Sequence, residues 1–198
     1  MPFVGACLGA SIQRLGILIF TLLAFSKTFS QETIEIKKPT EGKSLVYFIR
    51  PTAVAFLVNF KVFDKDTFLG TLSSKKYFTY ECEPGEHLFW ATSENRDYVI
   101  ANLEANKTYV INVSPQMGAF VAGVNLIPYD PNVANHKKLF NKALTKGKEM
   151  VQDEKETAND QSETIQKGLE KYEELVASES NKIARLNPNM NFENANKE

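Results

Sequence analysis

The most reactive side chains of the sequence lie in the stretch YECEPGEHLFW, residues 80–90, which places Cys82, Glu83, Glu86 and His87 within six positions. A thiol and an imidazole can act as a nucleophile and its base, and the same side chains can bind a metal ion. A catalytic thiol needs a nearby cation or helix N-terminus, and its base needs a third group to orient it. The neighbouring sequence indicates neither a helix nor an orienting group.

Zinc needs three or four ligands, and the chain has no Cys-x-x-Cys or His-x-x-x-His pair. The sequence therefore predicts no catalytic, cofactor-binding or metal-binding residue, and we expect residues 80–90 to form a structural turn. The alternative is a small-ligand-binding protein or an enzyme that uses Cys82 and His87.

The turn itself is predicted at Pro84 and Gly85, which fit the two central positions of a type II turn. In a tight hairpin, Cys82 would face His87 across the strands, on a surface rich in Phe and Tyr. A type II turn twists against the natural hand of a hairpin, so the pair can instead carry the chain around a corner between two sheets. In that case we expect Cys82 and His87 to separate.

The elements on either side are short runs with a two-residue period, rich in Val, Ile, Phe, Tyr and Thr. In the second run Phe56, Val58, Phe60 and Val62 are expected to share one buried face. This pattern predicts a mainly β fold, an antiparallel β-sandwich of about eight short strands in a domain of residues 44–130. The runs are residues 44–50, 56–64, 67–72, 76–82, 87–92, 98–103, 108–113 and 120–127.

The sequence after this domain changes to a helical period. It predicts an amphipathic helix at 131–151, a polar linker at 152–163, an amphipathic or coiled-coil-like helix at 164–187 and a disordered tail at 188–198. The second helix carries an apolar stripe that could contact a protein partner, a second copy of the chain or its own sandwich. The stripe is Ile165, Leu169, Tyr172, Val176, Ile183 and Leu186.

The first 30 residues have the pattern of a signal peptide. Arg14 precedes an apolar run at 15–25, which is shorter than the ~20 residues of a membrane-spanning helix. Thr28 and Ser30 suit a cleavage site, and residues 31–43 indicate a linker. We expect export to a periplasmic, envelope-associated or extracellular location, with no transmembrane span after cleavage; an uncleaved anchor is the alternative. Cleavage would leave Cys82 as the only thiol, so no internal disulfide is expected.

The charge of the chain gives no reason to expect a nucleic-acid partner, because the formal net charge is only −1. Arg50 and Arg96 could each hold an anion, although single arginines at strand ends are common. Trp90 could stack on a sugar, but packing in the core is the more ordinary role of an aromatic side chain in a strand.

Residues 43–130 resemble a family of exported bacterial domains, domain-of-unknown-function family 2846. The resemblance rests on the order of LVYFIRP, FLGTLSSKKYF, EPGEH, NLEANKTYVINV and GAFVAGVNLIPYD. Lys75 and Asn106 stand where such sequences usually have glycine. The resemblance implies an exported β-sandwich and assigns no cofactor or catalytic residue. We therefore expect an exported, non-enzymatic binding or structural module of the cell envelope, with the sandwich as a platform and the C-terminal helix as an interaction arm.

Overall fold

The structure is a computed structural model that describes residues 36–117, 122–151 and 160–192. The predicted signal peptide, residues 1–30, lies outside the described residues, as does most of the predicted polar linker. The described residues all belong to one compact unit of the chain. None of their helices is both long enough and apolar enough to cross a membrane.

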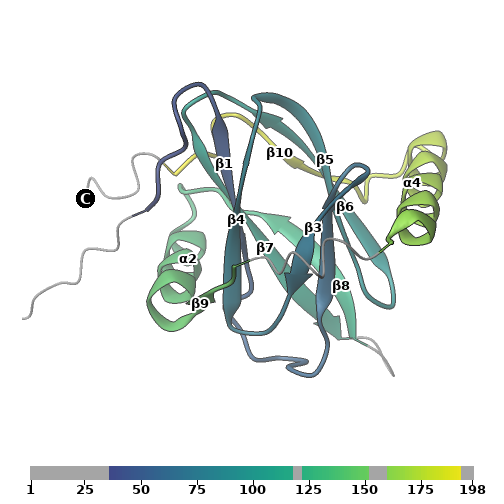
Figure 1. The fold of residues 1–198 in the computed structure, drawn as a ribbon, viewed down its shortest axis with the longest axis horizontal. Coiled ribbons are helices and arrows are strands. Elements are labelled where there is room, and N and C mark those ends of the chain that lie inside the picture. Colours follow the sequence, from purple (N-terminus) through teal and green to yellow (C-terminus); the bar gives the residue numbers. More distant parts are fainter. Residues whose placement is uncertain (1–35, 118–121, 152–159, 193–198) are drawn as a thin grey trace, which may run out of the picture. The chain divides into compact units, whose positions relative to one another are not determined.

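The described residues form two five-stranded sheets (Figure 1). Sheet A contains, in spatial order, β8 (Ala122–Pro128), β7 (Thr108–Met117), β1 (Ser44–Ile49), β4 (Lys76–Cys82) and β9 (Lys148–Glu149). Sheet B contains β10 (Ala184–Leu186), β6 (Arg96–Leu103), β5 (Gly85–Thr92), β2 (Phe60–Asp64) and β3 (Thr67–Leu72). Strands β1 to β8 correspond to the eight predicted runs, so the prediction of a mainly β fold is confirmed.

The prediction of a purely antiparallel arrangement is wrong. β1 pairs with β7 in parallel, and the two short strands β9 and β10 pair in parallel with β4 and β6. Alternating apolar residues show that a strand has one buried face, but they do not show which strand lies beside it or in which direction.

The two sheets share one hydrophobic cluster between them. Phe48 of β1 stacks on Phe78 of β4 in sheet A, with ring centroids 5.2 Å apart. Phe48 also meets Phe89 of β5 in sheet B edge to face, at 5.3 Å. All six residues of β1 are buried because its other face is covered as well. Burial on both faces explains why β1 reads as a continuous apolar run rather than an alternating one.

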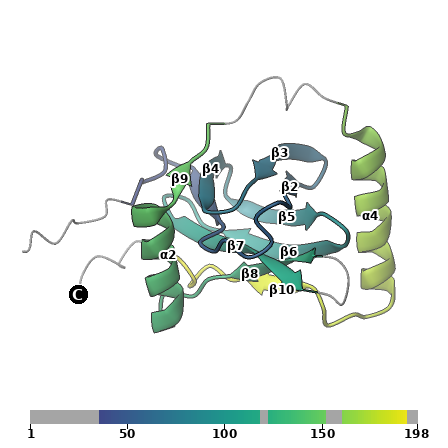
Figure 2. The ribbon, with the colours of Figure 1, turned by 90° about the horizontal axis from the view of Figure 1, so that it is seen from below.

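Helix α2 (Ala134–Lys146) packs on the outer face of sheet A (Figure 2), where Phe140 contacts Tyr47 of β1 with ring centroids 5.2 Å apart. The predicted helix at 131–151 is therefore too long at both ends. The extended backbone of Gly147 ends α2, its N–H bonds to the Ala143 carbonyl, and β9 follows directly. A tail from residue 188 was also predicted to be disordered. Instead Phe192 is buried against Phe140, and residues 193–198 lie outside the described part of the chain.

Helix α4 (Ser162–Ala177) packs on the outer face of sheet B (Figure 2). A Cβ atom at Gly168 would lie 2.4 Å from Cη2 of Trp90, so only glycine allows the helix to approach this closely. Tyr98 donates a hydrogen bond to the Gly168 carbonyl at 2.7 Å. The predicted helix at 164–187 begins two residues earlier and ends ten residues sooner. The chain turns at Glu179, whose φ is 50°, and then forms β10.

Candidate functional site

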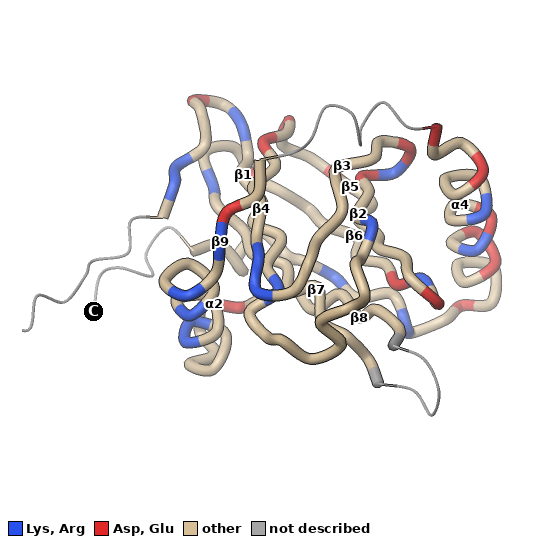
Figure 3. Tube along the Cα trace, turned by 60° about the horizontal axis from the view of Figure 1, so that its bottom comes forward, with Lys and Arg blue, Asp and Glu red and all other residues tan. Residues whose placement is uncertain are grey.

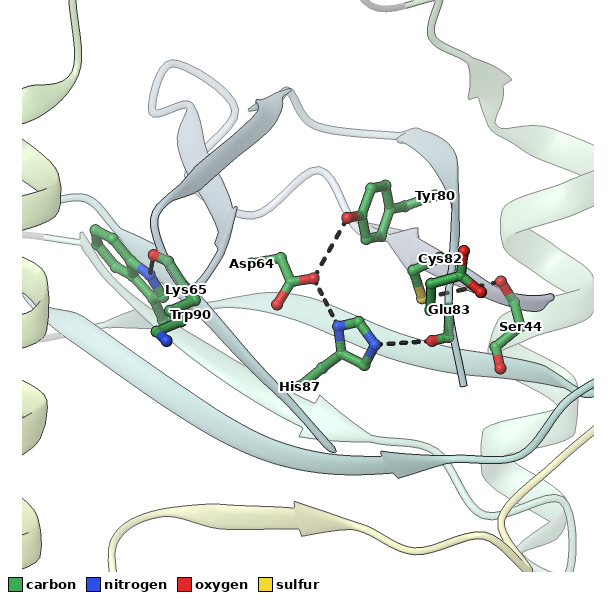
Figure 4. A network of polar contacts seen from close by, with 8 residues as sticks. All are labelled: Ser44, Asp64, Lys65, Tyr80, Cys82, Glu83, His87 and Trp90. Atoms are coloured by element: carbon green, nitrogen blue, oxygen red, sulfur yellow. Dashed lines mark hydrogen bonds and ion pairs between the residues drawn. The ribbon is translucent and has the colours of Figure 1, made fainter. Parts of the chain in front are cut away.

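The turn at Pro84 and Gly85 carries the chain from β4 in sheet A to β5 in sheet B. The corner between sheets is therefore present, and the tight hairpin is not. Gly85 has a φ of 132°, a conformation that other residues rarely adopt. Cys82 remains near enough to His87 across this corner to contribute to the raised pKa of His87. The hydrogen bonds of the two side chains go elsewhere, from Cys82 to Ser44 and from His87 to Asp64 and Glu83 (Figure 4).

His87 is held by hydrogen bonds at both ring nitrogens. Nδ1 lies 2.7 Å from Oδ2 of Asp64, and Nε2 lies 2.9 Å from the Glu83 carbonyl oxygen. A carboxylate and a carbonyl are both acceptors at these distances, so both nitrogens must carry hydrogen to satisfy them. The protonated, positively charged ring is the form that this geometry favours.

The electrostatics of the site agree with that protonation state. The hydrogen bond to Asp64 contributes most to raising the pKa of His87, to about 10, and the Cys82 side chain and the Glu83 carbonyl contribute further. Burial acts in the opposite direction, because the side chains of His87 and Asp64 are only 15% and 11% exposed. The carboxylate also accepts a hydrogen bond from the Tyr80 hydroxyl at 3.3 Å.

Cys82 is a buried thiol, and its Sγ donates a weak hydrogen bond to the Ser44 carbonyl oxygen, 3.9 Å away. A histidine activates a thiol either as a neutral base or, when protonated, as a cation that stabilises the thiolate, and both roles place a ring nitrogen at Sγ. Both nitrogens instead donate to oxygens. The arrangement therefore ties the corner to β2 by a buried ion pair.

Asp64 is the orienting group that the sequence analysis did not find. It continues the alternation of Phe60 and Val62 by one more step, and these side chains face the cluster between the sheets. An acidic residue on a buried face needs a partner, and that signal was present in the sequence. Within the described residues, no three His, Cys, Asp or Glu side chains are grouped so that they could hold a metal ion.

Arg50 follows β1 directly, and its side chain is fully buried. The guanidinium group donates to the carbonyl oxygens of Val58, Ala55 and Val54 at 2.6, 2.7 and 3.0 Å. It also lies over the Phe60 ring, with Cζ 4.3 Å from the centroid. Burial lowers the pKa of Arg50. Arg50 therefore fixes the segment that follows it, the β1–β2 loop of residues 50–59, by binding the chain's own carbonyls.

The β1–β2 loop exposes its apolar side chains, contrary to the expectation that Phe56 shares the buried face of Phe60. Val54, Phe56 and Leu57 are 49%, 66% and 82% exposed. β2 starts only at Phe60 because the carbonyls before it bind Arg50 instead of a neighbouring strand. This loop was not predicted from the sequence. The alternation at 56–62 fits a strand, and the residue that interrupts it, Arg50, lies outside the run.

A pocket of about 310 Å³ lies beside the β1–β2 loop. It is lined by residues of this loop, of the β3–β4 turn and of the end of α2: Pro51, Thr52, Ala53, Lys75, Lys142, Lys146 and Gly147. Lys75 adopts a φ of 55° in this turn, which is the left-handed conformation that glycine adopts more easily. Three lysines and no carboxylate therefore surround this pocket.

Trp90 and Arg96, which the sequence analysis considered for sugar and anion binding, are buried or partly buried in sheet B. Trp90 is fully buried, stacks on Phe63 with centroids 4.0 Å apart and donates to the Lys65 carbonyl at 2.8 Å (Figure 4). Arg96 begins β6, partly buried, with its Nε unpaired. The turn before β6 is fixed by Asn95, whose side-chain amide donates to the Val124 carbonyl at 2.9 Å.

The residues of the predicted apolar stripe are divided among three environments. Ile165, Tyr172 and Ile183 pack against the cluster of Phe63, Trp90 and Tyr98 on sheet B, and Leu186 is buried in the core between the sheets. Leu169 is partly buried, and Val176 is 51% exposed.

Comparison of the chain with known protein families finds no match. Neither the curated proteins nor the solved structures contain a match.

Proposed function

We propose that this chain is an exported, non-enzymatic binding module of the cell envelope, with a β-sandwich as its stable platform. The observation that carries the proposal is the hydrogen bonding of His87. The residue best suited to catalysis uses both ring nitrogens to hold the corner between the sheets. The pattern of the first 30 residues and the resemblance of residues 43–130 to exported domains support the assignment to the envelope.

Contacts of the C-terminal helix α4 within the chain reduce the surface that is free to bind a partner. Ile165 and Tyr172 of α4 already face the aromatic cluster on sheet B, so most of the predicted stripe is occupied within the chain. An interaction arm that reaches a partner through this stripe would have to detach α4 from Trp90 and Tyr98. A binding surface on another part of the platform requires no such rearrangement.

The second candidate function is thiol chemistry at Cys82, and one observation favours it: Cys82, His87 and Asp64 lie together. The comparison that separates the two functions is the reactivity of Cys82. In the full chain carrying Cys7→Ser, we expect a thiol reagent to label Cys82 slowly at neutral pH and rapidly after denaturation, because the thiol is buried.

The matched control is the same chain with Cys82→Ala and Ser178→Cys, which places a thiol at an exposed position after α4. We expect this control to react at similar rates in both states. Rapid labelling of native Cys82, with a thiol pKa well below the usual value, would contradict the non-enzymatic function.

A further inference from the structure

We propose that the β1–β2 loop and the three lysines beside it form a docking surface for a membrane that carries anionic lipid headgroups. This proposal rests on the proposed binding function and names the chemistry of its partner. The side chains concerned are Val54, Phe56 and Leu57 on the loop and Lys75, Lys142 and Lys146 around the pocket.

The apolar part of the surface is concentrated at one place. Among the described residues six large apolar side chains are exposed, and three of them lie within four positions of the β1–β2 loop. Phe56 and Leu57 are the most exposed of these three. Exposed apolar side chains that cluster in this way mark sites of contact with a protein or a membrane, whereas scattered ones need no explanation.

The loop is fixed in the conformation that exposes these side chains. The buried Arg50 binds the carbonyls of Val54, Ala55 and Val58, and the Val58 N–H closes a turn onto the Ala55 carbonyl at 3.0 Å. Ala55 itself has a φ of 51°. A buried cation and a left-handed residue are costly to place in a loop that only joins two strands. Both keep the apolar side chains directed away from the core.

The charge beside the loop is positive and uncompensated. Lys37, Lys43, Lys167 and Lys171 each form an ion pair with a carboxylate. Within the described residues Lys75, Lys142 and Lys146 have no ion pair, as is true of several other lysines, but these three line one pocket together. Figure 3 shows lysines on α2 near those of the β3–β4 turn. Their ammonium groups are therefore available to an external anion.

An anionic membrane offers a partner both for the apolar side chains of the β1–β2 loop and for the three lysines beside it. Apolar side chains can enter the boundary between headgroups and acyl chains, while lysines bind the phosphates above it. The pocket of about 310 Å³ that these lysines line offers room for a headgroup. An acidic protein would satisfy the lysines, but it would leave the exposed Phe56 and Leu57 to be matched by a complementary apolar cleft.

Vesicle flotation tests the proposal on residues 31–198, which contain both sheets and all three hydrophobic clusters. A cooperative unfolding transition would first establish that this part is folded. We expect it to bind vesicles of equal parts phosphatidylglycerol and phosphatidylcholine, and to bind phosphatidylcholine vesicles at least about tenfold more weakly, since about three lysines contribute. Millimolar inorganic phosphate should not displace it.

Two double variants separate the contribution of the apolar side chains to vesicle binding from the contribution of the lysines. Phe56→Ser with Leu57→Ser, and Lys142→Gln with Lys146→Gln, should each weaken binding to the anionic vesicles about tenfold or more. The matched control is Val176→Ser with Lys182→Gln, an exposed apolar and cationic pair near the end of α4, which should bind as the unchanged chain does.

Three results would overturn the membrane proposal. They are no binding to anionic vesicles, equal binding to both kinds of vesicle, and an unchanged affinity in the loop variant. Binding to soluble polyglutamate through the lysines, without binding to vesicles, would also overturn it and would indicate an acidic protein partner. In each case a protected Cys82 would leave the proposed binding function standing, whereas a reactive native Cys82 would remove that function independently of the vesicles.

Discussion

Two connections that carry the chain from sheet A to sheet B use their side chains in opposite ways. In the β4–β5 corner the side chains of Cys82 and His87 turn inward, where His87 bonds to Asp64 and the Glu83 carbonyl, and Cys82 bonds to the Ser44 carbonyl. The β1–β2 loop contains ordinary apolar residues, and Phe56 and Leu57 turn outward. The connection whose residue types suggest catalysis has both ring nitrogens of His87 engaged within the protein, and the connection whose sequence resembles a strand presents exposed apolar side chains.

A buried cation organises each connection. His87 bonds to a carboxylate and to the carbonyl of Glu83, while Arg50 bonds only to carbonyls and lies over the Phe60 ring. The difference between these two connections shows that residue type alone does not locate a functional site. What matters is whether the polar atoms of a side chain are already engaged within the protein, and whether its apolar surface is already covered.

The largest expected change in stability concerns two phenylalanines, Phe56 and Phe60, which were predicted from the sequence to share one buried face. Phe60→Ala should lower the free energy of unfolding by about 3–5 kcal/mol, because the ring is fully buried between the sheets. Phe56→Ala should change it by less than about 0.5 kcal/mol, because the ring is exposed. Urea denaturation of both variants measures the difference. Equal effects would mean that the loop is not exposed as described.

The next largest change in the free energy of unfolding is expected when the buried Arg50 is replaced. Arg50→Met should lower the free energy of unfolding by about 3 kcal/mol, because the carbonyls of Val54, Ala55 and Val58 lose their charged donor. Limited proteolysis should then cut the β1–β2 loop faster. The control is Arg96→Met, the other arginine at a strand end, which should cost less than about 1 kcal/mol. A stable Arg50→Met variant with a protected loop would refute the role of Arg50.

A smaller effect is expected from the pH dependence of the His87–Asp64 pair. The pKa of His87 is raised to about 10 in the folded chain, above its ordinary value of 6.5, so the stabilisation is complete below that value and is lost as pH rises towards 10. Between about pH 7 and pH 9 the free energy of unfolding should fall by about 2 kcal/mol. Asp64→Asn should flatten this slope. An identical slope in the variant would show that Asp64 does not hold the proton on His87.

Much of the fold could be predicted from local sequence. The runs at 67–72 and 76–82 match β3 and β4 at both ends, because alternating side chains and turn residues bound them. The short strands β9 and β10 could not be found this way. Each has only two or three residues, which carry too little pattern, and each exists because another strand lies beside it.

The candidate site was predictable only in part. A structural role for Cys82 and His87 was predicted in part because no orienting third group was evident. That ground is wrong, because Asp64 lies 18 residues before Cys82 and reaches His87 from a neighbouring strand. The exposed β1–β2 loop depends on the side chain of Arg50 bonding to carbonyls four to eight residues later. Both features are tertiary contacts, which a two-residue period cannot show.

The most direct test of the central claim is the protonation state of His87 in the folded chain at about pH 8, a pH chosen below the raised pKa and above the ordinary one. A long-range proton–nitrogen correlation spectrum, with His87→Gln to assign the ring, reports both nitrogens. We predict that Nδ1 and Nε2 both carry hydrogen, as a structural cation bonded to Asp64 and Glu83 requires. A neutral ring with one bare nitrogen would contradict the claim that His87 is a cation held by Asp64 and the Glu83 carbonyl.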